Sequence, residues 1–120
     1  MGEYKFQSLL IYQISLDYID KIYDLIKKLP GEEKYNLSSQ LVRAATSIAL
    51  NIAEGSTGQS DKEQSRFLSL ALRSYLETVA CLDLIQRRNN ISLENLKELR
   101  KTGRTLFYKI TTFRKSLKNN

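Results

Sequence analysis

Hydrophobic residues recur along most of this chain at steps of three and four, the spacing that places them on one face of an α-helix. The first such stretch covers residues 7–29, and its apolar stripe consists of Leu10, Ile14, Tyr18, Ile22, Leu25 and Leu29. The breaker pair Pro30-Gly31 ends it. A second stretch covers residues 37–54, and its stripe consists of Leu37, Leu41, Ala44, Ala45, Ile48 and Ile52. Gly55 then provides a C-terminal stop. The pattern therefore predicts two helices before residue 56.

The third predicted helix, residues 60–88, is apolar on nearly every side. Ser60 and Glu63 have the spacing of a capping box, in which the Ser60 hydroxyl accepts from the Glu63 amide and the Glu63 carboxylate accepts from the Ser60 amide. A helix that is apolar all round must be buried all round. Charged residues interrupt the apolar run too often for a membrane span: Arg73, Glu77 and Asp83. The surplus apolar surface therefore predicts burial between subunits.

The fourth predicted helix covers residues 92–117, with Ser92 as its N-cap. Its apolar positions form a heptad-like seam of Leu96, Leu99, Gly103, Leu106, Ile110, Phe113 and Leu117. Four helices joined by short connections favour an all-α fold, an antiparallel up-down-up-down four-helix bundle. With 120 residues the chain fits one domain, residues 1–120.

Composition removes most catalytic chemistry. The chain has no histidine, so the usual general base and the common zinc and haem ligands are missing. The one cysteine, Cys81, lies within the apolar third helix and is interpreted as a small buried hydrophobe. We therefore expect no enzyme activity, no cofactor and no metal site. A single cysteine without a secretory signal makes the cytoplasm the expected compartment.

Positive charge is concentrated at the C-terminal end. Residues 1–85 carry nine Lys and Arg against eleven Asp and Glu, whereas residues 86–120 carry ten against two. An anionic partner is therefore expected, with RNA or DNA favoured over a membrane surface, because the apolar seam of the last helix is needed for the core. A well-solvated basic face is the alternative. The candidate phosphate-binding residues are Arg87, Arg88, Lys97, Arg100, Lys101, Arg104, Tyr108 and Lys115.

A second polar group lies on the second and third predicted helices. Its members follow helical spacing beside the apolar stripes: Arg43, Ser47, Asn51, Glu54, Ser74 and Glu77. We interpret it as a buried structural network in which Arg43 pairs with Glu54 or Glu77, because a buried charge needs a partner. It would fix helix register or a subunit contact. The alternative, a carboxylate site for a cation or an acid–base pair, is weaker, since two carboxylates make a poor metal site.

The same stretch carries a family resemblance. The run from Gln40 to Gly55 contains Arg-x-x-x-Ser-x-x-x-Asn-Ile-Ala-Glu-Gly, and Ala71-x-x-Ser74-x-x-Glu77 follows downstream. This pattern resembles the signature of a bacterial four-helix-bundle family whose members include proteins encoded in intervening sequences of large-subunit ribosomal RNA genes. The chain departs from that pattern at Arg73, where glycine is usual, and at Gly58 and Gln59, where a basic residue is common.

The resemblance implies a homopentamer, a barrel around a central channel. It also implies kinship with the accessory protein of diversity-generating retroelements, a basic pentamer that binds nucleic acid and a reverse transcriptase. Residues and resemblance together favour a non-enzymatic homo-oligomer that binds RNA or DNA through its last helix. The alternative is a scaffold for a protein partner, such as a reverse transcriptase or a ribosome-associated factor, without contact to nucleic acid.

Overall fold

The computed structural model describes residues 2–32, 36–58 and 60–117 and confirms the all-α fold. These residues contain no β-strand. They form four α-helices, α1 (Leu10–Ile26), α2 (Leu37–Gly55), α3 (Asp61–Arg88) and α4 (Lys97–Ser116), and two short 3-10 helices, η1 (Lys5–Ser8) and η3 (Glu94–Leu96). None of the described helices is long and apolar enough to cross a membrane.

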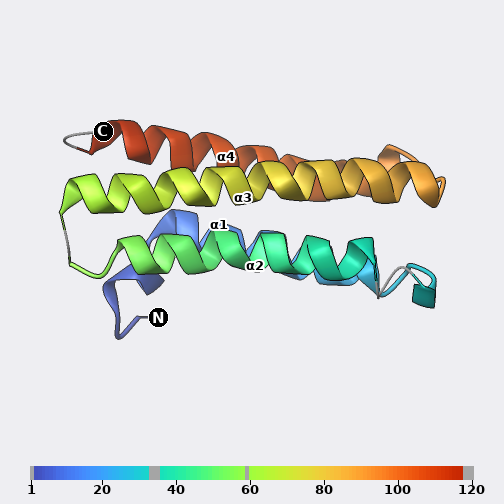
Figure 1. The fold of residues 1–120 in the computed structure, drawn as a ribbon, viewed down its shortest axis with the longest axis horizontal. Helices are drawn as coiled ribbons and strands as arrows, with labels where there is room; N and C mark the ends of the chain where they lie inside the picture. The colour runs from blue at the N-terminus through green and yellow to red at the C-terminus, as the bar shows by residue number, and fades with distance from the viewer. Residues whose placement is uncertain (1, 33–35, 59, 118–120) are drawn as a thin grey trace.

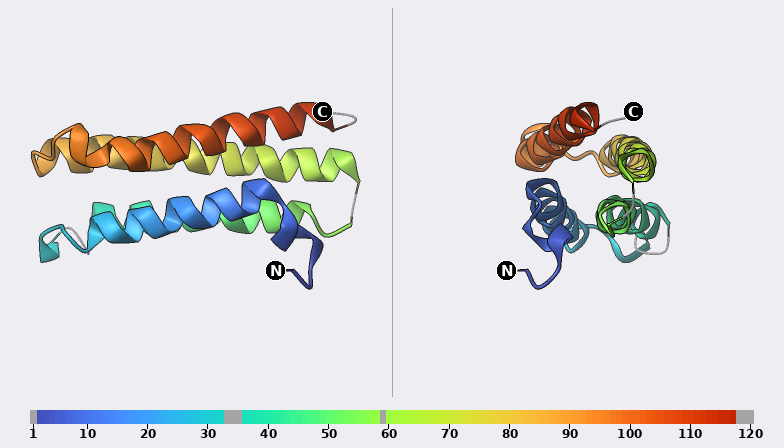
Figure 2. Two further views of the ribbon diagram at one scale, coloured as in Figure 1. Left: turned by 180° about the vertical axis from the view of Figure 1, so that it is seen from behind. Right: turned by 90° about the vertical axis from the view of Figure 1, so that its left-hand side faces the viewer.

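Consecutive α-helices run in opposite directions along a bundle 44 Å long (Figure 1). Seen end-on, the four helices occupy the corners of a square in chain order, so that α1 lies beside α2 and α4 but diagonally across from α3 (Figure 2). The most extensive packing is between α2 and α3. Because the number of antiparallel helices is even, the start of α1 and the end of α4 lie at the same end of the bundle.

The helix ends differ in detail from those that the sequence predicts. The first helix is shorter, because Leu9 has extended backbone angles that separate η1 from α1. Ser60 caps α3 as expected, and its hydroxyl accepts from the Glu63 amide at 3.1 Å. The reciprocal half of the capping box is wrong, since the Glu63 carboxylate instead accepts from the Arg66 guanidinium at 2.7 Å. The fourth helix begins later than predicted, at Lys97, and the prediction of Ser92 as its N-cap is wrong. Ser92 accepts from the Asn95 amide but precedes Leu93, the N-cap of η3, which leads into α4.

The connection between α2 and α3 is tight, because α2 ends on a glycine that α3 approaches closely. A Cβ atom on Gly55 would lie 2.8 Å from the Phe67 Cβ atom, closer than side chains tolerate. The next residue, Ser56, donates its hydroxyl hydrogen to the Ile52 carbonyl and accepts from the Gln64 side-chain amide at 3.1 Å. Gly55 and Ser56 thus hold the second and third helices together at the point where the chain reverses.

The centre of the core is built around Tyr18, which lies on α1 and is 1% exposed. Its hydroxyl lies 2.8 Å from the Thr78 hydroxyl on the diagonally opposite helix α3. The Thr78 hydroxyl hydrogen is already donated to the Tyr75 carbonyl, so Tyr18 must donate to Thr78. On α4, a Cβ atom on Gly103 would lie 2.8 Å from the Tyr18 ring and 3.0 Å from the Tyr75 ring. One side chain therefore fixes the positions of three helices.

Around Tyr18 the core is apolar. Its largest fully buried hydrophobic side chains come from all four α-helices and η3, and they are Ile22, Leu41, Ile48, Ile52, Leu68, Leu82, Ile85, Leu96, Leu106 and Ile110. Burial raises the pKa of Tyr18 to about 12, against the opposing effect of the hydrogen bond with Thr78. It also raises the pKa of Tyr75. The two tyrosines therefore stay neutral over the whole physiological range.

Replacing Gly103 by alanine should destabilise the bundle. Forcing a methyl group into a filled core costs about 1–3 kcal/mol, whereas the better helix propensity of alanine returns at most about 1 kcal/mol. Urea unfolding should show a lower free energy of unfolding. The matched control is Gly31→Ala, because no heavy atom of a described residue outside its chain neighbours lies within 4 Å of the position of its added Cβ atom. Equal stability of the two variants would contradict the packing described at Tyr18.

Tyr18→Phe should change the pH dependence of stability at alkaline pH. A folded-state pKa of about 12, above the ordinary 10, gives Tyr18 a stabilising contribution that is complete below pH 10 and is lost as the pH rises through 12. Between pH 10 and 12, the free energy of unfolding of the unaltered chain should fall by about 2 kcal/mol more than that of the variant. Below pH 10, the lost hydrogen bond should cost about 1 kcal/mol. Identical pH profiles would show that Tyr18 is not desolvated.

Candidate nucleic-acid interface

One side of α4 carries a row of four exposed basic side chains and one exposed tyrosine. Its members are Lys97, Lys101, Arg104, Tyr108 and Lys115, which we call the α4 stripe. They lie on the side of the helix opposite its buried residues Leu99, Leu106 and Ile110. No residue of the stripe is buried, and among the described residues its Lys and Arg side chains form no ion pair. The structure therefore brings together five of the eight residues that the sequence proposes for phosphate binding.

Arg100 has a different environment from the α4 stripe. Its guanidinium donates to the Asp83 carboxylate at 3.0 Å and to the Gln86 side-chain carbonyl at 2.9 Å, and both residues lie on α3. The Arg100 side chain is 21% exposed. The negative charge of the Asp83 carboxylate offsets the attraction of this guanidinium for a phosphate. Arg100 thus joins α4 to α3, an arrangement that the spacing of charges along the sequence does not reveal.

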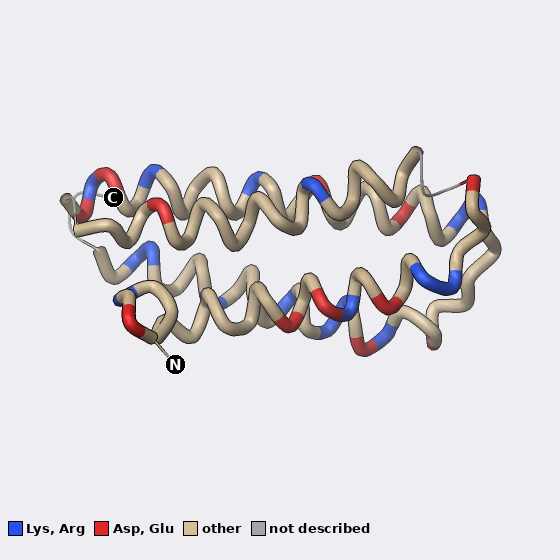
Figure 3. The backbone as a smooth tube through the Cα atoms, turned by 90° about the horizontal axis from the view of Figure 1, so that it is seen from below, with Lys and Arg blue, Asp and Glu red and all other residues tan. Residues whose placement is uncertain are grey.

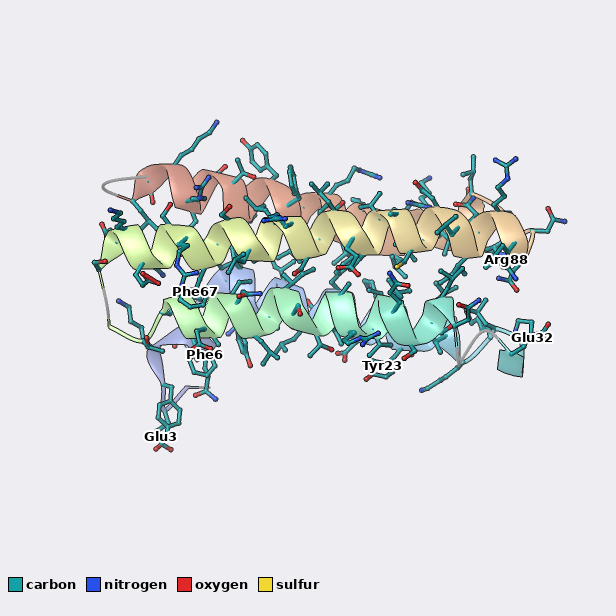
Figure 4. The ribbon with its side chains drawn as sticks, viewed as in Figure 1. Glu3, Phe6, Tyr23, Glu32, Phe67 and Arg88 are labelled. Carbon is teal, nitrogen blue, oxygen red and sulfur yellow. The ribbon has the colours of Figure 1, made fainter. Side chains whose placement is uncertain are left out.

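Arg87 and Arg88 end α3 and are both exposed. Arg88 lines a hollow of about 320 Å³ together with Glu32, Asn36 and Asn89. Figure 4 shows Arg88 close to Glu32, at the end of the bundle where α1 connects to α2. The structure therefore places Arg88 against the α1–α2 connection and not in line with the α4 stripe.

The outward side of α3 adds positive charge that the sequence analysis did not assign to binding. Arg73 is exposed there, two residues before Tyr75, whose ring lies 5.2 Å from that of Phe107 on α4. Lys62 is exposed near the start of the same helix. Since Arg73 points outward, its replacement of the usual family glycine does not disturb helix packing. Counting which α3 positions face away from Leu68 and Ala71 would have found both residues.

The two halves of α1 differ in charge, and each half lies beside a different end of α4. The first two turns of α1 have no charged residue, whereas its second half carries Asp17, Asp20 and Asp24. Figure 3 shows acidic and basic positions alternating in the half of the bundle away from the N-terminus. Because α1 and α4 are antiparallel, Asp24 lies near Glu98 at the start of α4, where both line one hollow. The end of α4 lies beside the uncharged start of α1.

The second polar group is largely exposed within one chain. Arg43, Glu54 and Glu77 are exposed, so their predicted burial is wrong for the single chain, and Arg43 has no ion pair among the described residues. Asn51 donates to the Ser47 carbonyl of its own helix at 2.8 Å. Ser74 is half-buried. A contact between α2 and α3 is made instead by the Gln40 amide, which lies 3.5 Å from the Glu77 carboxylate. A role of the group in subunit contacts stays a prediction.

Arg43 and Ser47 also border a hollow on the outward side of α2. They line a hollow of about 420 Å³ with Ser39, Val42, Thr46 and Leu50. Leu50 is 62% exposed there. Sequence spacing placed the polar group at the border of the apolar stripe. The same spacing puts Leu50 opposite that stripe, on the outward side of the helix.

No catalytic constellation accompanies these surfaces in the part of the chain that is described. It contains no group of three or more Cys, Asp or Glu side chains able to hold a metal ion. Cys81 is buried, and burial, with the negative charge of Glu77, raises the pKa of its thiol. A thiol with a raised pKa is a poor nucleophile. The exposed basic side of α4 therefore remains the strongest candidate site.

Comparison with known proteins agrees with the helical architecture. The family model described as 23S rRNA-intervening sequence protein matches residues 7–112. The chain is also similar to a protein of unknown function from the S23 ribosomal protein family of Bacteroides thetaiotaomicron, known from a crystal structure. The TM-score is 0.79 and the identity 28%, over 89% of this chain and 100% of that one. A comparison with curated proteins finds no match. The family model covers most of the described helices, and the chain belongs to the 23S rRNA-intervening sequence protein family.

Proposed function

We propose that this chain is a non-enzymatic protein that assembles with copies of itself and binds RNA or DNA through the α4 stripe. The observation that carries this proposal is the exposure of Lys97, Lys101, Arg104 and Lys115 on one side of a helix, without ion pairs to described residues. Cations held in a row on a rigid element suit the regular charges of a nucleic-acid backbone.

The length of the α4 stripe sets the expected mode of binding. From Lys97 to Lys115 the helix rises about 27 Å, since each residue adds 1.5 Å. Phosphates of one strand repeat every 3.4 Å along a duplex, so the stripe spans about eight of them. Four cations that each neutralise one phosphate should give log Kobs against log salt a slope of about −3.6 for a duplex and about −2.8 for a single strand. Contacts of this kind position the protein without reading sequence.

Self-association is proposed from exposed apolar side chains on the outward sides of α2 and α3. Leu50, Leu76 and Leu84 are each at least half exposed, and α3 is not covered on all sides within one chain. Burial between subunits would remove this surface from water, at about 25 cal/mol per Å² of apolar area. The family resemblance implies five copies around a channel.

The same leucines favour a second candidate function, a scaffold that binds a protein partner without contacting nucleic acid. The two candidates differ in what the α4 stripe does. In the scaffold, the stripe is a solvated face, and reversing its charge leaves partner binding intact.

Reversing two charges of the α4 stripe should abolish binding to nucleic acid. We expect Lys101→Glu with Arg104→Glu to weaken binding of a fluorescent RNA or DNA oligonucleotide by at least 100-fold in fluorescence anisotropy at low salt, because two attractions become repulsions. The matched control is Lys5→Glu with Lys27→Glu, which has the same net charge but changes exposed residues outside α4. Equal losses of affinity in both variants would show that binding depends on the net charge of the chain and not on the α4 stripe. Absence of binding by the unaltered chain would contradict the proposed function.

The solution mass of the unaltered chain, measured by light scattering, should be a multiple of the 13.9 kDa of one chain. Leu76→Glu should lower that mass, because a charge inserted into an apolar interface is left without a partner. Leu93→Glu is the control, since Leu93 is 77% exposed but lies in the α3–α4 connection. A monomeric unaltered chain would contradict self-association.

A further inference from the structure

An apolar hollow of about 300 Å³ lies where the start of α1 meets the second half of α4. Its lining comes from both helices and from Leu9 just before α1: Leu9, Leu10, Ile11, Tyr108, Lys109, Thr112 and Phe113. Hollows of this size and composition, mostly apolar with a few polar groups, are typical of small ligand sites. This one opens beside the α4 stripe, since Tyr108 belongs to both.

Two large apolar side chains of this hollow are exposed to solvent. Leu10 is 57% exposed and Tyr108 is 69% exposed. The sequence pattern placed Leu10 in the core, but the buried face of α1 begins with Ile11 and continues through Tyr18 and Ile22. Leu10 lies about 100° away from Ile11 around the helix and is therefore off that face. The hollow therefore offers an aliphatic surface and an accessible aromatic ring to an occupant with an apolar face.

The positive charge around the hollow favours an occupant that carries negative charge. Lys109 is part of its wall, and Arg104 lies one turn before Tyr108 on the same helix. Lys115 lies two turns after Tyr108 and is exposed. The neighbouring turns of α1, residues 10–16, contain no acidic residue. An occupant that combines a flat apolar body with negative charge on either side would satisfy both the hollow and its rim.

We propose that the hollow holds an unpaired base of single-stranded nucleic acid, stacked on Tyr108, with the flanking phosphates on Arg104, Lys109 and Lys115. The proposal rests on the proposed function and adds to it a preference for single strands. In a duplex, both faces of each base are covered by neighbouring bases, so the Tyr108 ring has no face to meet. In a single strand, bases stack readily on aromatic side chains beside a positive groove, with little sequence preference.

The first test uses fluorescence, because the chain has no tryptophan. Tyr108→Trp places a single indole at the mouth of the hollow. A short oligothymidylate should quench its emission, and a duplex of the same length should not. Tyr23→Trp is the control, since Tyr23 is 47% exposed on α1 away from the hollow. Its emission should not respond to either probe.

The second test measures affinity for the same two probes by anisotropy. Tyr108→Ala should weaken oligothymidylate binding by about 5- to 100-fold, weaken duplex binding much less, and preserve the salt slope with both probes, because stacking is lost and charge is kept. Tyr23→Ala should change neither affinity. Tyr108 is exposed, so the variant should fold normally, as circular dichroism can verify.

The outcomes separate this inference from the proposed function. If both probes bind with a salt slope but Tyr108→Ala weakens neither or both equally, or the indole at position 108 is not quenched, the base site is wrong and the α4 stripe remains. If Tyr108→Ala lowers the solution mass instead, a second copy covers the hollow and the base site is again wrong. If neither probe binds the unaltered chain, the proposed function fails together with the inference.

Discussion

The hydroxyl of Tyr18, held by Thr78 across the bundle, is the contact on which the arrangement of this molecule depends. A polar group in an apolar centre is stable only where its partner lies within hydrogen-bond reach, so this contact allows few relative positions of α1 and α3. Gly103 adds the third helix, because only a residue without a side chain lets α4 approach the two tyrosine rings. Rotating α4 by one residue would bring a side chain to that point and turn its basic side toward a neighbour. The direction in which the α4 stripe faces is thus set in the core.

Helical periodicity was sufficient to predict the parts of the site that depend on one helix alone. The steps between Lys97, Lys101 and Arg104 place them opposite the apolar seam, and the structure has them exposed. Periodicity failed wherever the answer depends on a second helix. It grouped Arg100 with the stripe because it contains no information on Asp83. Its assignment of Leu10 to the core was wrong for a different reason, because the buried face of α1 passes through Ile11 and not through Leu10.

Some residues of the family signature have a structural role within a single chain, and others do not. Gly55 is required where α3 passes close to the end of α2. Asn51 bonds to its own helix. Arg43, Glu54 and Glu77 are exposed and make no ion pair with one another. These charged residues belong to the signature but do not stabilise the chain on which they lie. A partner outside the chain, including another copy, is the natural explanation for them.

The even number of antiparallel helices determines at which end of the bundle the chain ends and the connections lie. The start of α1 and the end of α4 meet at one pole of the bundle, and the opposite pole carries the α1–α2 and α3–α4 connections (Figure 2). Any segment joined to either end of the chain therefore emerges at the pole that also contains Leu10 and Phe113. Neither end of the described part of the chain lies at the other pole. An appendage at either terminus would thus lie beside the hollow. The connecting loops at the far pole can vary in length and sequence without covering the hollow.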